Sequence, residues 1–193
     1  MTVFSTQEID IASDPITLLI KNRVIEKAVS LMGDVEKWIM PLFEGVNLPS
    51  EINLDNGKIS KGEQYKFLPY VLLDYPAHYT KNNVFAIRTM FYWGNFISIS
   101  IHLKGIYLAR YGKQILEIFK NNPSIYFCVH HSEWEYDYSE RNYKLLPPLK
   151  EEEINLQFVD HGFVKFSTKL PIDKIHQTKE MTDAFLKPIL EIL

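Results

Sequence analysis

Apolar residues recur at helical spacing in three long parts of the chain. The first pattern begins at Asp14, a helix-capping residue followed by Pro15 at the first helical position, and its apolar stripe runs to Leu31 before Gly33. Similar stripes predict helices at about 104–120 and 173–193, where Pro188 should bend or end the last one. We therefore expect helices at both ends of the chain and one in the middle.

Shorter signals fill the first third of the chain. Ser5 and Glu8 have the spacing of a capping box, which predicts a short helix there. Apolar residues at 38–43 indicate another short helical segment, although Pro41 limits its regularity. Residues 46–62 are mostly polar and contain the turn signal "DNG", so they are interpreted as the longest loop. The apolar run at 70–74, between two prolines, is interpreted as a short strand.

Two stretches flank the tripeptide "WGN", and in each of them successive side chains alternate between two faces with a period of two. Residues 84–92 and 96–103 are rich in aromatic and β-branched residues, so they predict a hairpin with a three-residue loop. This closure pairs Tyr92 with Phe96 and keeps one face apolar, whereas a two-residue loop would mix apolar and polar residues on both faces. The register therefore predicts which side chains lie on the same face of the sheet as Arg88.

Arg88 falls opposite Ser100 and diagonal to Ser98 and His102, with Tyr92 at the aromatic rim. A basic, hydroxyl and imidazole patch of this kind can bind a small anion, because a guanidinium holds a carboxylate or phosphate with two hydrogen bonds. The alternative is an ordinary solvated sheet face on which the arginine stem lies over aromatic carbons. The sequence leaves both interpretations open.

The segment "SIYFCVHHSEWEY", residues 124–136, is interpreted as a further strand. Cys128 and His130 would share a face that can join the Arg88 patch, which makes His130 a candidate ligand-binding residue. A thiolate pair between them is less favoured than an inert buried cysteine. His131 with Glu133 could bind a metal ion, but no third ligand is suitably spaced, so we expect no metal site.

The last third contains a second apparent hairpin, "INLQFV-DHG-FVKFSTKL", with Asp160 and His161 as turn formers. The alternative, suggested by the glutamates, is that residues 150–159 start as a helix. The segment "EWEYDYSE", residues 133–140, alternates acidic and aromatic residues, which is typical of an edge strand with one wet face.

Composition narrows the function classes. The 193 residues contain 21 basic and 24 acidic side chains, mixed along the chain with a net charge of −3, so no basic stripe for nucleic acid is visible. A single cysteine excludes an intramolecular disulfide, and neither a leader pattern nor a membrane-spanning apolar run appears, so we expect no membrane partner and a cytoplasmic location. No nucleotide-binding, nucleophile-elbow or zinc-protease motif is present, so no cofactor is predicted.

The stretches "LPYVLLDYPAHY" and "FAIRTMFYWGNFISISIHLKG" resemble the central block of an uncharacterised family of bacterial proteins. The resemblance covers about residues 68–105 and implies no residue role.

Together these patterns predict one α+β domain over residues 1–193, with a mostly antiparallel sheet of about five strands and helices packed on one face. Three functional hypotheses remain. The first is a small-ligand or anion-binding domain that uses the Arg88, Ser100 and His102 face. The second is an interaction or structural domain, or a homodimer, that uses aromatic residues such as Tyr92, Trp93, Trp134 and Tyr136. The third, an enzyme with histidine acid–base chemistry, has no visible nucleophile or metal set to support it.

Overall fold

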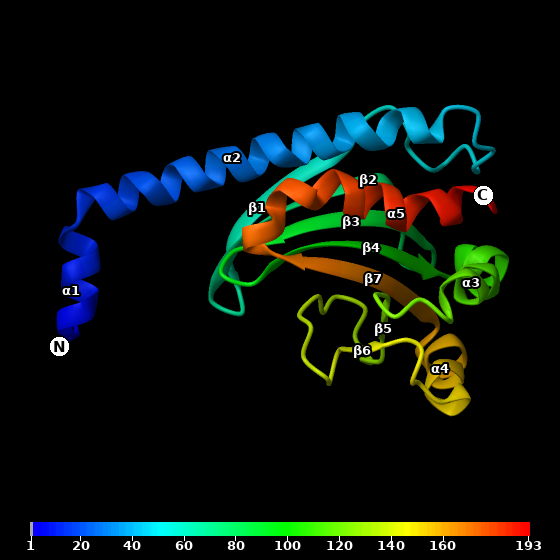
Figure 1. The fold of residues 1–193 in the computed structure, drawn as a ribbon. Coiled ribbons are helices and arrows are strands. Elements are labelled where there is room, and N and C mark those ends of the chain that lie inside the picture. The colour runs from blue at the N-terminus through cyan, green and yellow to red at the C-terminus, as the bar shows by residue number, and fades with distance from the viewer. Residues whose placement is uncertain (1) are drawn as a thin grey trace.

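The chain forms an α+β fold around one antiparallel sheet, as the computed structural model shows for residues 2–193 (Figure 1). The sheet has seven strands in the order β1-β2-β3-β4-β7-β5-β6, not about five as predicted. The strands are β1 (Lys58–Tyr65), β2 (Leu68–Tyr79), β3 (Val84–Tyr92), β4 (Phe96–Lys104), β5 (Tyr126–Cys128), β6 (Tyr143–Leu145) and β7 (Phe163–Pro171). The helices are α1 (Thr6–Ser13), α2 (Pro15–Ile39), α3 (Ile106–Phe119), α4 (Glu151–Leu156) and α5 (Thr178–Leu190).

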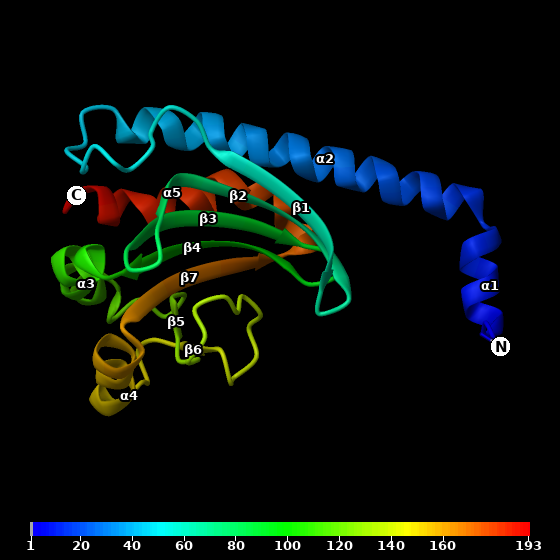
Figure 2. The ribbon, with the colours of Figure 1, turned by 180° about the vertical axis from the view of Figure 1, so that it is seen from behind.

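The predicted β3–β4 hairpin is confirmed, including its register. Tyr92 pairs with Phe96 and Arg88 with Ser100, so the three-residue loop sets which side chains share a face. One face carries a mostly apolar set that includes Ile87, Ile99 and Phe166, all at most 1% exposed, and is interrupted by the buried Thr89. Helices α2 and α5 lie across this face, as Figures 1 and 2 show from opposite sides. The main core therefore lies between these helices and the sheet.

Helix α2 does not end at Gly33 as expected. It continues to Ile39, because Met32, Val35 and Ile39 extend the buried stripe against the core. A glycine inside a helix costs only about 1 kcal/mol relative to alanine, which tertiary packing exceeds. The short helical segment expected at 38–43 is the end of α2 followed by a 3₁₀ turn, Met40–Phe43.

Strand β1 accounts for part of the difference in strand number, whereas β2 was predicted and differs in its length. The predicted loop at 46–62 contains the first half of β1, an edge strand whose polar residues are mostly exposed or half-buried and show no apolar alternation. Strand β2 is longer than the expected 70–74 and includes both flanking prolines, with a register irregularity between Asp74 and Ala77. A Pro-interrupted strand of this kind is hard to recognise from composition.

The second predicted hairpin is wrong in its first half. Residues 151–156 form α4 and residues Gln157–His161 a π-helical turn, so the helical alternative was correct. The second half is confirmed as β7, which pairs with β4 and β5 instead of a neighbouring hairpin strand. The final helical pattern divides into a 3₁₀ segment, Ile172–Gln177, and α5, which contains Pro188.

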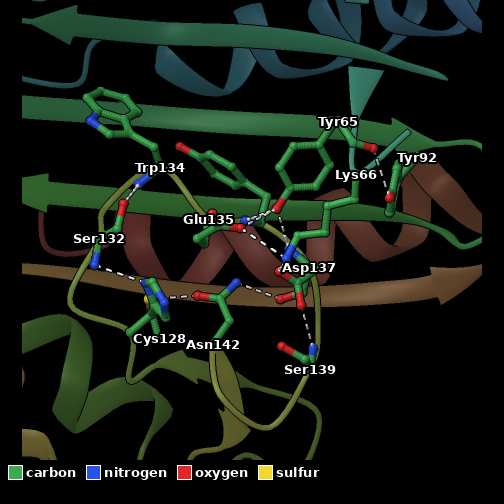
Figure 3. Close-up of polar contacts among 12 residues, drawn as sticks. Tyr65, Lys66, Tyr92, Cys128, Ser132, Trp134, Glu135, Asp137, Ser139 and Asn142 are labelled. Carbon is green, nitrogen blue, oxygen red and sulfur yellow. Dashed lines mark hydrogen bonds and ion pairs between the residues drawn. The ribbon is translucent and has the colours of Figure 1, made fainter. Parts of the chain in front are cut away.

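The other face of the sheet is covered by the connection between β5 and β6, residues 129–142, which we call the cover loop. Figure 3 shows this loop lying over the strands, with Glu135 and Asp137 next to Lys66. The edge strand expected at 133–140 is therefore wrong, because this segment contains no strand. Its alternating acidic and aromatic residues contact the sheet and neighbouring loops instead of forming a ladder.

Within residues 2–193, none of the helices combines the length and the apolar character that crossing a membrane requires.

Candidate functional site

Arg88 lies under the cover loop and is paired with a carboxylate that the sequence patterns did not reveal. Its Nε donates to Asp74 Oδ1 at 2.7 Å and its Nη2 donates to Asp74 Oδ2 at 2.8 Å. The ring of Tyr136 packs over the guanidinium, with its centroid 4.5 Å from Cζ. The expectation of an open patch or a solvated sheet face around Arg88 is thus corrected, since the arginine side chain is only 13% exposed.

The other residues predicted for this patch do share the face, but they are closed off from solvent. Ser98, Ser100 and His102 are exposed by 6%, 3% and 1%. Tyr92 is also buried, and its hydroxyl donates to the backbone oxygen of Tyr65. A ligand could not reach Ser98, Ser100 or His102 without displacement of the cover loop, whereas Tyr92 also borders a separate pocket of about 380 Å³.

His130 belongs to the cover loop and is not brought to Arg88. Its ring stacks on that of His131 at 4.3 Å, and its Nδ1 accepts a hydrogen bond from the backbone N–H of Ser132. Cys128 is fully buried, and its thiol donates to Asn142 Oδ1 at 3.4 Å. Burial raises the pKa of this thiol, which agrees with an inert core cysteine.

Lys165 of β7 ties the cover loop to the sheet. The side chain is fully buried, and its Nζ donates to the backbone oxygens of Glu133, at 3.0 Å, and Glu135. The Tyr136 ring centroid lies 4.3 Å from the same ammonium. Burial lowers the pKa of Lys165 to about 8, because the cation loses its hydration. Two carbonyls and an aromatic face replace that water.

The far side of the cover loop is held by the β1–β2 turn. Lys66 Nζ lies 2.7 Å from Asp137 and 3.3 Å from Glu135, as Figure 3 shows. The hydroxyl of Tyr65 accepts hydrogen bonds from the backbone N–H groups of Tyr136 and Asp137. These contacts satisfy backbone groups that would be unpaired in a covered loop, so the loop is a fixed part of the structure.

His102 contributes a buried imidazole beside a carboxylate. Its Nε2 lies 3.2 Å from Glu133 Oε2, close enough for a polar contact. Lys104 Nζ approaches the other oxygen of Glu133 at 2.7 Å. Burial lowers the pKa of His102 to about 4, while His102 and Lys104 hold the pKa of Glu133 at about 2. We therefore treat His102 as neutral and Glu133 as ionised at neutral pH.

This arrangement predicts an acid-sensitive fold. Between pH 6.5, where an ordinary histidine titrates, and pH 4, the unfolded chain takes up a proton that folded His102 does not. The free energy of unfolding should therefore fall as the pH is lowered through this window, by up to about 3 kcal/mol at roughly 1.4 kcal/mol per pKa unit. When urea unfolding is measured between pH 7 and pH 4, the free energy of unfolding should fall less steeply with decreasing pH for His102→Gln than for the surface control His131→Gln. Equal slopes in the two variants would contradict this role of His102.

An open pocket of about 440 Å³ lies at the edge of the cover loop, where it meets β1 and β2. Asp74 and Arg88 contribute to it, together with Ala77 and Gly57. Its polar and aromatic lining also includes Asn53, Asn56, Lys58, Tyr79 and Trp134. Of the predicted patch, Arg88 borders this pocket, and Tyr92 borders a different one of about 380 Å³.

The chemistry of this pocket is that of a weakly cationic site with an aromatic wall. Lys58 and Arg88 carry positive charges and Asp74 a negative one, so the lining charges sum to +1. Asp74 occupies Nε and Nη2 of Arg88, while Nη1 makes no hydrogen bond to any residue of the described chain, 2–193. The rings of Tyr79 and Trp134 lie 6.3 Å apart. The Tyr79 hydroxyl donates to Asp74 Oδ1.

A larger pocket of about 590 Å³ lies between β5, β7 and α5. Its lysine, Lys169, directs its ammonium onto the rings of Tyr126 and Tyr138, at 5.2 and 4.4 Å. Its charge is thus already engaged with aromatic faces, and Glu180 adds a negative charge to the lining. Size alone therefore does not make this the better candidate for an anion.

Sequence reasoning selected Arg88 for its unusual place in an apolar ribbon but missed the residues that complete the pocket. Lys58, Asn53 and Asn56 come from the expected loop at 46–62, and Trp134 was predicted only as part of an interaction surface. Of the aromatic residues in that surface, Trp134 is 52% exposed, whereas Tyr92 and Tyr136 are buried. Within residues 2–193, no group of three or more His, Cys, Asp or Glu side chains is arranged to hold a metal ion.

No protein-family model matches the chain, and no curated protein or solved structure is significantly similar to it, so the resemblance of residues 68–105 stays a prediction and the site is interpreted from its own geometry.

Proposed function

We propose that this protein binds a small anionic ligand in the pocket bordered by Arg88 and Lys58. The observation that carries the proposal is the free Nη1 of an arginine whose orientation is fixed by Asp74, at the border of a pocket of about 440 Å³. A guanidinium held in this way loses little freedom when it donates to a ligand. The volume lies within the roughly 300–1,000 Å³ range of small-molecule sites.

The remaining lining indicates the class of ligand. Lys58 supplies a second, flexible cation that can reach a carboxylate or phosphate group. Asn56 offers an amide donor, whereas the Asn53 amide is hydrogen-bonded to Asn56 and to the N–H of Asp55. Tyr79 and Trp134 present rings that favour a planar or aromatic portion. The proposed ligand is therefore a small molecule that combines one anionic group with a flat apolar part. Its binding does not need Ser98, Ser100 or His102.

Affinity measurements with three probes test this proposal: inorganic phosphate, benzoate and phenyl phosphate. Phenyl phosphate should bind most tightly by isothermal titration calorimetry, because it alone combines the phosphate charge with a ring. Lys58→Ala and Trp134→Ala should each weaken it about tenfold, which corresponds to about 1.4 kcal/mol. Both side chains are exposed enough that their removal should leave the fold intact.

The matched control is Lys61→Ala, three residues along the same strand and outside this pocket. It removes the same charge from the protein and should leave the affinity for phenyl phosphate unchanged. The proposal fails if none of the three probes binds, or if Lys61→Ala weakens binding as much as Lys58→Ala does.

A further inference from the structure

The N-terminal arm, residues 3–20, extends beyond the end of the sheet. It consists of α1 and the first part of α2, which project away from the body in both views (Figures 1 and 2). Eight of its large apolar side chains are between 43% and 80% exposed, among them Phe4, Ile16 and Leu19. No residue of α1 is buried. So much apolar surface on one projecting element is unusual for a part that faces only water.

The apolar surface of the arm continues a stripe that is buried elsewhere in the same helix. Ile16, Ile20 and Val24 are spaced by four residues, and the same spacing leads to Ala28 and Met32. Ala28 and Met32 are 4% and 0% exposed where α2 lies on the sheet, whereas Ile16 and Ile20 are 65% and 46% exposed beyond it. A helix that only faced solvent would be polar at these positions. The exposed part of the stripe is therefore suited to packing against another structural element.

The charges on this surface favour a second copy of the chain. The arm contains Glu8, Asp10 and Asp14 but no basic residue, whereas residues 21–27 contain three basic residues and one acidic residue. Arg23, Lys27 and the neighbouring Lys61 are exposed, and none of them forms an ion pair within the described chain. One surface thus carries opposite charges at its two ends. Such a surface is complementary to itself when two copies lie antiparallel.

An apolar pocket at the base of the arm supports the same arrangement. Its volume is about 210 Å³, and its lining includes Ile25 and Ala28 of α2, Tyr70 and Phe91 of the sheet and Trp93 of the β3–β4 loop, with Lys61 and Glu63 as its two charged residues. In an antiparallel pair, the first helix of one copy would reach this end of the other. Apolar side chains such as Phe4 or Ile9 could then enter the pocket.

We propose that two copies of the chain pair through their N-terminal arms, antiparallel about a two-fold axis. The apolar stripes of the arms cover each other, and each acidic α1 lies against the basic base and the apolar pocket of the other copy. The eight exposed large apolar side chains of the arm and the lining of the apolar pocket form the proposed contact surface. A negatively charged membrane is a poorer occupant, because the acidic arm would be repelled by it. The proposal is independent of the ligand pocket at Arg88.

Sedimentation equilibrium of the full chain over a range of concentrations tests this pairing. The wild type should show twice the 22.6 kDa mass of one chain. Ile16→Glu combined with Leu19→Glu should give the single-chain mass, while circular dichroism shows the same folded content, since both side chains are exposed. Arg23→Glu combined with Lys27→Glu should raise the dissociation constant at least about tenfold, and added salt should weaken the wild-type dimer.

The control is Val159→Glu, which places one glutamate at another exposed apolar residue, 76% exposed and remote in sequence from the arm. This variant should remain dimeric. A wild type that is monomeric at every concentration would overturn the proposal. So would a dimer that persists in the Ile16→Glu and Leu19→Glu variant, or a dissociation constant that the charge reversals leave unchanged. Binding of a monomeric wild type to phosphatidylcholine vesicles would also overturn it, in favour of a lipid surface.

Discussion

Replacement of Arg88 by alanine is expected to destabilise the protein by about 3–5 kcal/mol, because it breaks a buried ion pair. The variant leaves Asp74 buried, 8% exposed in its side chain, without the guanidinium that neutralises it. The remaining carboxylate keeps the Tyr79 hydroxyl as a donor but loses both hydrogen bonds and the opposite charge of the guanidinium, which makes this a larger penalty than the loss of a neutral hydrogen bond. Chemical unfolding of Arg88→Ala against the wild type measures the effect.

Two further variants separate the pair from the loss of side-chain packing. Arg88→Met combined with Asp74→Leu removes both charges and should be more stable than Arg88→Ala, since no unpaired charge remains. Arg110→Ala, at an exposed arginine of α3, should change the stability by less than about 0.5 kcal/mol. If Arg88→Ala retained nearly the wild-type stability, Arg88 would be the free anion receptor that the sequence first suggested, and its pairing with Asp74 would be of little consequence.

Replacement of Lys165 by alanine is the second large effect that we expect. The backbone oxygens of Glu133 and Glu135 lose their donor, and a cavity forms beneath the ring of Tyr136. Unpaired buried carbonyls and a large-to-small change together predict a loss of about 2–4 kcal/mol, since relief of the buried cation offsets part of the penalty. The loss should be concentrated in the cover loop.

Cys128 provides a local readout for this prediction. It is the only cysteine of the chain and is fully buried in the wild type, so a thiol reagent should react with it slowly. In Lys165→Ala the reaction should accelerate, and the backbone N–H groups of residues 129–142 should exchange with deuterium faster. Lys144→Ala, at an exposed lysine of β6, should change neither rate. A cover loop that stays equally protected in Lys165→Ala would show that Lys165 does not hold it.

The elements that were predicted correctly are those whose side chains alternate or repeat over one buried face. The β3–β4 hairpin is of this kind, because a three-residue loop and a strict apolar face leave one register. The end of α2 was placed too early, since Gly33 is a strong local stop signal while Val35 and Ile39 contribute to stability only through the distant sheet. Local propensity and tertiary packing disagree at that point, and packing determines the structure.

The candidate site was harder to predict, because it is assembled from long-range contacts. Asp74 and Arg88 are 14 residues apart in sequence, and only the β2–β3 register brings them opposite each other. The cover loop has an alternating pattern that favours a strand, yet its backbone is satisfied by side chains of Lys165 and Tyr65. No spacing rule identifies such partners. The sequence could indicate that Arg88 is unusual, but not which groups surround it.

The central claim is that the anion site lies in the pocket beside Lys58 and not on the covered sheet face. An NMR titration of the labelled protein with phenyl phosphate tests it most directly, because each backbone N–H group and the Trp134 indole N–H report separately. We expect shifts at Asn53, Asn56, Lys58 and the Trp134 indole, with the N–H groups of Ser98 and Ser100 unchanged. Shifts centred on Ser98 and Ser100, or no shifts at all, would contradict this claim.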